Sequence, residues 1–161
     1  MSDSSKPKQA FSGCCRAAAT VPDEAFTSHG SMLFSNEAIP TTIIKRNFRS
    51  PTQNSSYKSS TTTSAIAVTT QRLLVYVGSR CSKFVDAPWS ESRLRKIQFE
   101  LQSNDTHLSM QWDASLFVPE WSGTLQIILK FEGHDAAKKC MSIIEERLAA
   151  ARDEEALEME A

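Results

Sequence analysis

Alternating apolar and polar residues dominate the middle of the chain. Apolar side chains recur at every second position in three segments, residues 97–101, 108–112 and 125–131. A period of two is typical of antiparallel strands with one buried face. Two apolar runs, residues 65–68 and 73–77, flank a short polar break and predict a hairpin. We expect further short strands at residues 32–34, 41–44 and 82–86.

The period changes after Gly133. Apolar residues then follow at steps of three and four and form one stripe on a predicted helix, comprising Ala136, Ala137, Cys140, Met141, Ile144, Leu148 and Ala151. Asp135 suits the start of that helix. A helix that follows the last strand can plug the end of a curled sheet. The pattern predicts a mainly β, PH-like fold: a partly open antiparallel barrel of about seven strands, capped by one C-terminal α-helix.

The remaining segments set the domain boundaries. Residues 1–30 are rich in Ser, Ala, Lys and Thr without periodicity, which predicts a flexible N-terminal tail. The folded domain is expected over residues 31–151. Within it, residues 50–63 are polar and of low complexity, and we expect a mobile loop there. Residues 152–161 are interpreted as an acidic tail.

Charge and composition narrow the class of protein. With 18 basic and 19 acidic side chains the chain is nearly neutral, which argues against direct binding to nucleic acid. No apolar run approaches the roughly 20 residues of a membrane span, and the N-terminus has no apolar stretch typical of a secretory signal. We therefore expect a cytoplasmic or nuclear protein, with peripheral membrane association as an alternative.

The search for reactive groups points away from an enzyme. His29, His107 and His134 are scattered, and no nucleophile elbow, zinc-protease motif or phosphate loop occurs. The four cysteines form no C-x-x-C pair, so we expect a reduced protein without a metal site. No cofactor is expected either, and function is predicted to be binding.

Several segments resemble a known family. The hairpin A-I-A-V-T-T-Q-R-L-L-V-Y-V resembles the signature of GRAM domains, and F-V-D-A-P-W resembles the strand that follows it. L-Q-I-I-L-K-F-E-G-H-D-A-A-K-K-C-M-S-I-I-E-E-R-L is similar to the last strand and helix, and M-L-F-S to the opening strand. Over residues 31–150 the chain is most similar to the WW-domain-binding-protein-type GRAM adaptors.

The resemblance implies a monomeric PH-like adaptor that recognises a protein segment, in some relatives as a transcription coactivator. The alternative is a module recruited to membranes by phosphoinositides. The chain contains no P-P-x-Y motif, so recruitment of WW domains is not predicted.

Basic residues around the predicted loop are the candidate site for an anionic lipid, namely Lys45, Arg46, Arg49 and Lys58. Lysine and arginine form charge-assisted hydrogen bonds with phosphate oxygens. This hypothesis requires the four side chains to converge on one face. Otherwise they are ordinary solvated charges.

Aromatic residues near prolines are candidates for partner binding. Trp89 and Trp121 are either exposed contact residues or structural residues at the rim of the barrel. Arg72, which opens the second strand of the hairpin, either binds a partner or is a solvated arginine. Cys14 and Cys15 lie beside a basic residue and are either lipidation sites or free thiols.

Overall fold

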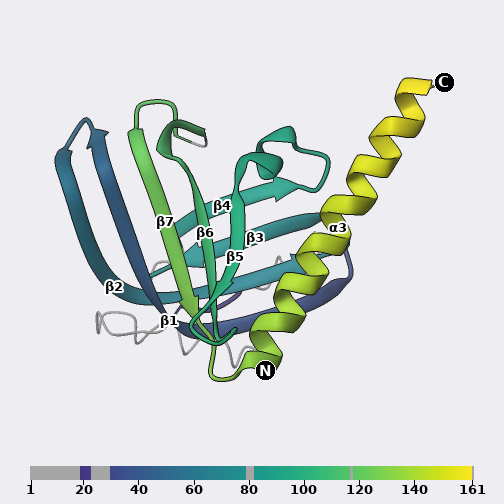
Figure 1. Cartoon of the computed structure of the whole chain (residues 1–161), viewed down its shortest axis with the longest axis horizontal. Coiled ribbons are helices and arrows are strands. Elements are labelled where there is room, and N and C mark those ends of the chain that lie inside the picture. Colours follow the sequence, from purple (N-terminus) through teal and green to yellow (C-terminus); the bar gives the residue numbers. More distant parts are fainter. Residues whose placement is uncertain (1–18, 23–29, 79–81, 117, 161) are drawn as a thin grey trace, which may run out of the picture.

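The computed structural model describes residues 19–22, 30–78, 82–116 and 118–160. Seven antiparallel strands form one sheet in the order β4-β3-β2-β1-β7-β6-β5 (Figure 1). The strands are β1 (Met32–Ser50), β2 (Gln53–Thr69), β3 (Arg72–Val77), β4 (Ser82–Pro88), β5 (Gln98–Gln102), β6 (His107–Asp113) and β7 (Ser122–Lys130). Two short 3₁₀ helices, η2 (Ser92–Lys96) and η3 (Ala114–Leu116), precede the long helix α3 (His134–Glu160).

The long strands β1 and β2 give the sheet its shape. Both bend strongly along their length, so that one half lies with β3 and β4 and the other half rises beside β7 (Figure 1). β1 contains a bulge between Asn36 and Ile39, where Ala38 has a φ of 54°. A bulge of this kind bends a strand locally. The sheet therefore curls into a half-barrel.

Alternating side chains from the strands fill the concave side of the half-barrel. Ile43, Ile66, Val75, Met110 and Ile127 are among the buried residues of this core. The predicted stripe of α3 joins it, because Ala137, Cys140, Ile144 and Leu148 are buried, and the helix packs mainly on β5 and β6. The predicted fold, a partly open antiparallel barrel of seven strands with one C-terminal helix, is confirmed.

The strands predicted at residues 32–34 and 41–44 belong to a single strand, β1. Pro40 does not end it, although proline lacks the N–H of a ladder bond. The ladder between β1 and β7 begins only at Thr41. The missing N–H of Pro40 therefore removes no hydrogen bond from that ladder. Its position beside the bulge makes proline tolerable inside β1.

The prediction of a mobile loop at residues 50–63 is wrong for most of that range. Only the turn between Ser50 and Gln53 joins the strands, and residues 53–63 form the first half of β2. They pair with β1, from Ser50↔Gln53 to Pro40↔Thr63. Threonine and tyrosine favour strands, but the segment lacks the apolar alternation that identifies one in a sequence.

Both predicted tails differ from the structure. The helix does not end at Ala151 but continues to Glu160, and residues 152–158 are exposed. Glu155 pairs there with Arg95 of η2, which holds this part of the helix. At the other end, Ala19 and Val21 are buried against the convex face of the sheet, in a second apolar cluster with Ala65, Ala67, Leu74 and Tyr76. Apart from residues 19–22 and Gly30, the predicted N-terminal tail lies outside the described residues.

Candidate binding surface

The four basic residues predicted as one site do not converge on one face. Lys45 lies opposite Lys58 on β2 and opposite the core residue Leu125 on β7, so both lysines lie on the concave side. Arg46 is the next residue along β1, and its side chain lies on the convex side. Arg49 follows a bulge and is exposed near the tip of the β1–β2 hairpin. The structure therefore brings together only Lys45 and Lys58.

Lys45 and Lys58 form a cross-strand pair of like charges. The Lys45 Nζ donates to Gln53 Oε1 at 2.8 Å and lies 4.6 Å from the centre of the Phe48 ring. Burial, together with the charge of Lys58, lowers the pKa of Lys45 from its usual value. Like charges directly opposite each other destabilise a sheet unless an anion compensates them. Among the described residues no carboxylate forms an ion pair with either lysine.

Arg46 belongs to a polar network on the convex face. It donates to Gln126 Oε1 at 2.8 Å, and Gln126 Nε2 donates to Ser109 Oγ at 2.8 Å. The network thus crosses β1, β7 and β6. Arg46 also lies 5.9 Å from the ring centre of Tyr57, which is 60% exposed. These contacts hold Arg46 away from the two lysines.

A bulge separates Arg46 from Arg49 and explains why the basic residues diverge. Asn47 has a φ of 50°, and the pairing of β1 with β7 shifts register between Arg46 and Arg49. Opposite the bulge, Gly123 has a φ of 95°, and a Cβ there would lie 2.2 Å from the Asn47 carbonyl oxygen. The close approach of two backbones requires glycine at this position.

The first half of β2 is an open edge of the sheet. β3 pairs with β2 only from Ser64 to Val68, and no described strand pairs with residues 53–62 on that side. The Thr63 carbonyl accepts from the Gly78 N–H at 2.8 Å, so the backbone groups of Thr63 point away from β1. Because these directions alternate along an antiparallel strand, Tyr57, Ser59 and Thr61 present their N–H and C=O groups to the open side.

The other two strand edges are protected. β5 has only five residues and packs against α3. β4 ends in Pro88 and carries Asp86, and charge and proline both discourage the pairing of a further strand. The edge of β2 is longer and carries a single charge, Lys58. Of the described strands, β2 therefore offers the best edge for a further strand.

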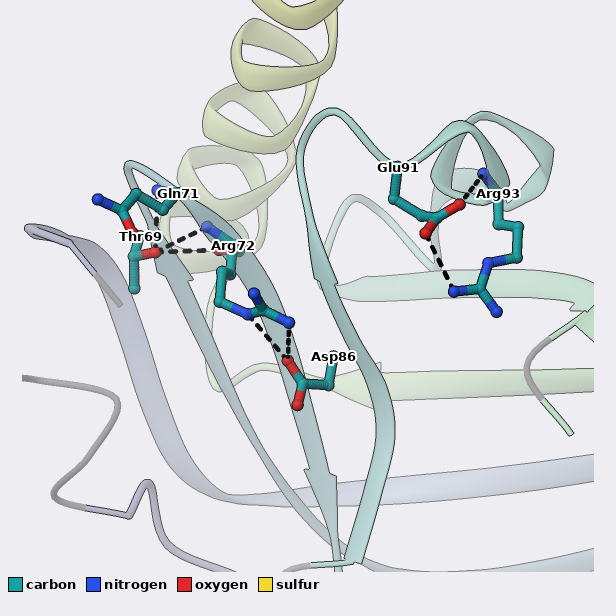
Figure 2. Close-up of polar contacts among 6 residues, drawn as sticks. All are labelled: Thr69, Gln71, Arg72, Asp86, Glu91 and Arg93. Atoms are coloured by element: carbon teal, nitrogen blue, oxygen red, sulfur yellow. Dashed lines mark hydrogen bonds and ion pairs between the residues drawn. The ribbon is translucent and has the colours of Figure 1, made fainter. Parts of the chain in front are cut away.

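Arg72 and Trp89, the candidates for partner contacts, both have partners within the chain at the turn between β2 and β3. The Thr69 hydroxyl accepts from the Gln71 and Arg72 N–H groups at 3.1 and 2.9 Å, and Arg72 pairs with Asp86 at 2.8 Å (Figure 2). Trp89 is buried, and its Nε1 donates to the Thr69 carbonyl at 2.8 Å. Both side chains thus have structural partners.

Next to this turn, Glu91 caps the helix η2. Its carboxylate accepts from the Arg93 N–H at 3.3 Å and pairs with the Arg93 guanidinium at 3.0 Å (Figure 2). Hydrogen bonds from Arg93 lower the pKa of Glu91. Arg93 also donates to the Leu116 carbonyl at 3.1 Å, which joins η2 to η3. The charged groups of Glu91 and Arg93 thus both have partners within the chain.

Trp121 is half-buried, and its ring packs edge-on against Phe48 with ring centres 5.2 Å apart. Phe48 in turn lies beneath Lys45. Trp121 is thus the one predicted partner residue that lies near the lysine pair. The lipidation candidates Cys14 and Cys15 lie outside the described residues.

We expect Cys140 to be unreactive in the folded protein. Burial raises the pKa of its thiol from 9.0 to about 12. Alkylation at pH 8, mapped by mass spectrometry, should spare Cys140 until urea unfolds the chain. The unfolded thiol ionises above about pH 9 while the folded one stays neutral, so this group lowers stability only as the pH rises past 9. Rapid labelling under native conditions would contradict the buried position.

Within the described part of the chain, no three His, Cys, Asp or Glu residues gather as metal ligands. None of its helices is long and apolar enough to cross a membrane.

Comparisons with known proteins give no family. No family model matches the chain, and no curated protein does. Among solved structures, it is similar to the Ran-binding domain of the nuclear complex component Nup2 from Ashbya gossypii, with a TM-score of 0.42 and 12% identity over 75% of this chain and 97% of that one. A likeness of this degree assigns the chain neither a family nor a partner. Membership of the GRAM family stays a prediction.

Proposed function

We propose that this protein is a non-catalytic binding module that recognises an extended protein segment by strand addition to the open edge of β2. The observation that supports it most is the run of backbone groups at Tyr57, Ser59 and Thr61 that face the open side and pair with no strand in the described part of the chain. An extended peptide can satisfy these groups as an added strand. The adaptor and coactivator roles implied by the GRAM resemblance remain compatible predictions.

Phosphoinositide recognition receives less support. That hypothesis requires Lys45, Arg46, Arg49 and Lys58 to meet on one face, and they lie on two faces and beyond a bulge. Two lysines remain together, and a phosphoinositide headgroup carries several phosphates that need more positive charge. Strand addition uses the backbone and does not depend on such a cluster.

Amide hydrogen exchange gives a direct signature of strand addition. In the free protein the N–H groups of Tyr57, Ser59 and Thr61 should exchange fast, whereas those of Lys58 and Ser60 are bonded to β1 and should be protected. A bound peptide should protect the first set and leave the second unchanged. Protection of both sets in the free chain would show that the edge is already occupied.

The substitution Ser59→Pro tests the same edge by mutation. Proline removes an N–H that points to the open side, so the fold should persist, while peptide binding should fall at least tenfold. Ser59→Ala keeps the N–H and should bind normally. Ser60→Pro removes an N–H that bonds to β1 and should destabilise the protein instead. Circular dichroism and a peptide titration distinguish these results, and full binding by Ser59→Pro would contradict strand addition.

A further inference from the structure

We propose that the segment recognised at the β2 edge is acidic, with a carboxylate side chain that lies opposite Lys58 and compensates the Lys45–Lys58 pair. The inference rests on the proposed strand addition and specifies the chemistry of the partner. The supporting observation is charge complementarity at a defined position of the edge. The argument depends on which residues of β2 are hydrogen-bonded to the incoming strand.

The position of Lys58 in the ladder brings a partner side chain close. Tyr57 and Ser59 present their backbone groups to the open side, so an antiparallel strand bonds to them and leaves Lys58 in a non-hydrogen-bonded pair. Side chains in such pairs approach most closely, with Cα atoms about 4.5 Å apart. A glutamate or aspartate opposite Lys58 therefore lies within reach of its ammonium group.

Lys45 adds a second, less mobile charge beside Lys58. Its Nζ is fixed by the hydrogen bond to Gln53 and by the Phe48 ring, and Lys58 lies directly across the ladder. A carboxylate there compensates both charges, and burial of Lys45 weakens screening by solvent. A partner strand with lysine at the same place meets two cations, Lys45 and Lys58, and is repelled.

The convex side sets a second requirement. Tyr57 is 60% exposed and lies over the Arg46 guanidinium, so the residue of the added strand opposite Tyr57 meets an aromatic ring. Aromatic and β-branched side chains are the favourable cross-strand partners of tyrosine. Since faces alternate, the recognised pattern is a carboxylate next to an aromatic or β-branched residue.

The chain does not supply this carboxylate from its own acidic end. Asp153, Glu154, Glu155 and Glu158 belong to the exposed part of α3, which lies on the opposite side of the molecule from the β1–β2 hairpin (Figure 1). The open edge of β2 in a second copy, residues 53–62, contains no carboxylate that could compensate the lysines. An acidic segment of another protein therefore fits the edge better.

Three matched peptides test the proposal on the full-length protein. Each is a labelled strand-forming peptide of about ten residues, the length of the open edge, identical except for Glu, Gln or Lys at one central position facing the lysines. Fluorescence anisotropy at low and moderate salt should show the Glu peptide binding about tenfold more tightly than the Gln peptide, and the Lys peptide most weakly. Salt should reduce the advantage of Glu.

Two variants test whether Lys58 causes the preference for the Glu peptide. Lys58→Gln should remove most of the difference between the Glu and Gln peptides, whereas Lys130→Gln, an equal charge change at an exposed residue of β7, should not. Equal binding of all three peptides, lost in Ser59→Pro, would overturn the acidic preference and leave strand addition standing. Absence of binding by any peptide would overturn both. Self-association by sedimentation that Ser59→Pro abolishes, with no effect of any peptide, would assign the edge to a second copy.

Discussion

Replacement of Trp89 by alanine is expected to lower the free energy of unfolding by about 3–5 kcal/mol. The side chain is 6% exposed and belongs to the main core. Its Nε1 also donates to the Thr69 carbonyl, which fixes the end of β4 against the turn between β2 and β3. The substitution therefore removes packing and leaves a buried carbonyl unsatisfied. Urea unfolding followed by circular dichroism measures the effect.

Two controls accompany this variant, one that separates packing from hydrogen bonding at Trp89 and one at an exposed residue elsewhere. Trp89→Phe keeps an aromatic ring but lacks the N–H, and it should cost about 1–3 kcal/mol. Leu157→Ala, at a residue that is 68% exposed on α3, should change stability by less than about 0.5 kcal/mol. Wild-type stability of Trp89→Ala would place Trp89 on the surface and restore its interpretation as a partner contact.

Gly123→Ala is expected to be the other strongly destabilising change, by about 2–4 kcal/mol. The residue has a φ of 95°, and the added Cβ would lie 2.2 Å from the Asn47 carbonyl oxygen and 2.6 Å from that of Arg46. Both atoms belong to the backbone of the bulge, so they cannot move aside without breaking the ladder between β1 and β7. The midpoint of urea unfolding should fall accordingly.

Gly78→Ala is a matched control for the conformational part of this effect. Gly78 also has a positive φ, 80°, but apart from its chain neighbours no atom of the described residues lies within 4 Å of a Cβ there. Gly78→Ala should lower the free energy of unfolding only by the strain of the left-handed conformation, about 1–2 kcal/mol. Equal losses at the two glycines would show that the bulge relaxes and that the contact with Asn47 is unimportant.

The fold was predictable wherever burial leaves a periodic pattern. The alternation at Leu108, Met110 and Trp112 predicts β6, and the three- and four-residue steps around Cys140 predict the packed part of α3. Residues 53–63 of β2 carry no such pattern, because that half-strand has no buried face of its own and is held by β1. The open edge was therefore missed, although Thr61, Thr62 and Thr63 are β-branched residues that favour a strand.

The arrangement of the candidate site residues could not be predicted from their spacing in the sequence either. Sequence spacing places Lys45, Arg46 and Arg49 together, but a strand sends neighbours to opposite faces, and the Asn47 bulge turns the third one away. The pairing of Lys45 with Lys58 depends on the register of the hairpin, which the missed half of β2 defines. A tryptophan next to a proline in the sequence does not show whether its indole N–H donates to a carbonyl within the chain, as that of Trp89 does to Thr69.

The central place of β1 governs the order in which the chain can assemble. β1 pairs on one side with its neighbour β2 and on the other with β7, about eighty residues later in synthesis, as the contact of Arg46 with Gln126 illustrates. A nascent chain on the ribosome can form the β1–β2 hairpin early but cannot close the sheet until β7 has emerged. Contacts between segments so distant in sequence slow folding, and during that interval the apolar face of the hairpin is open to chaperones.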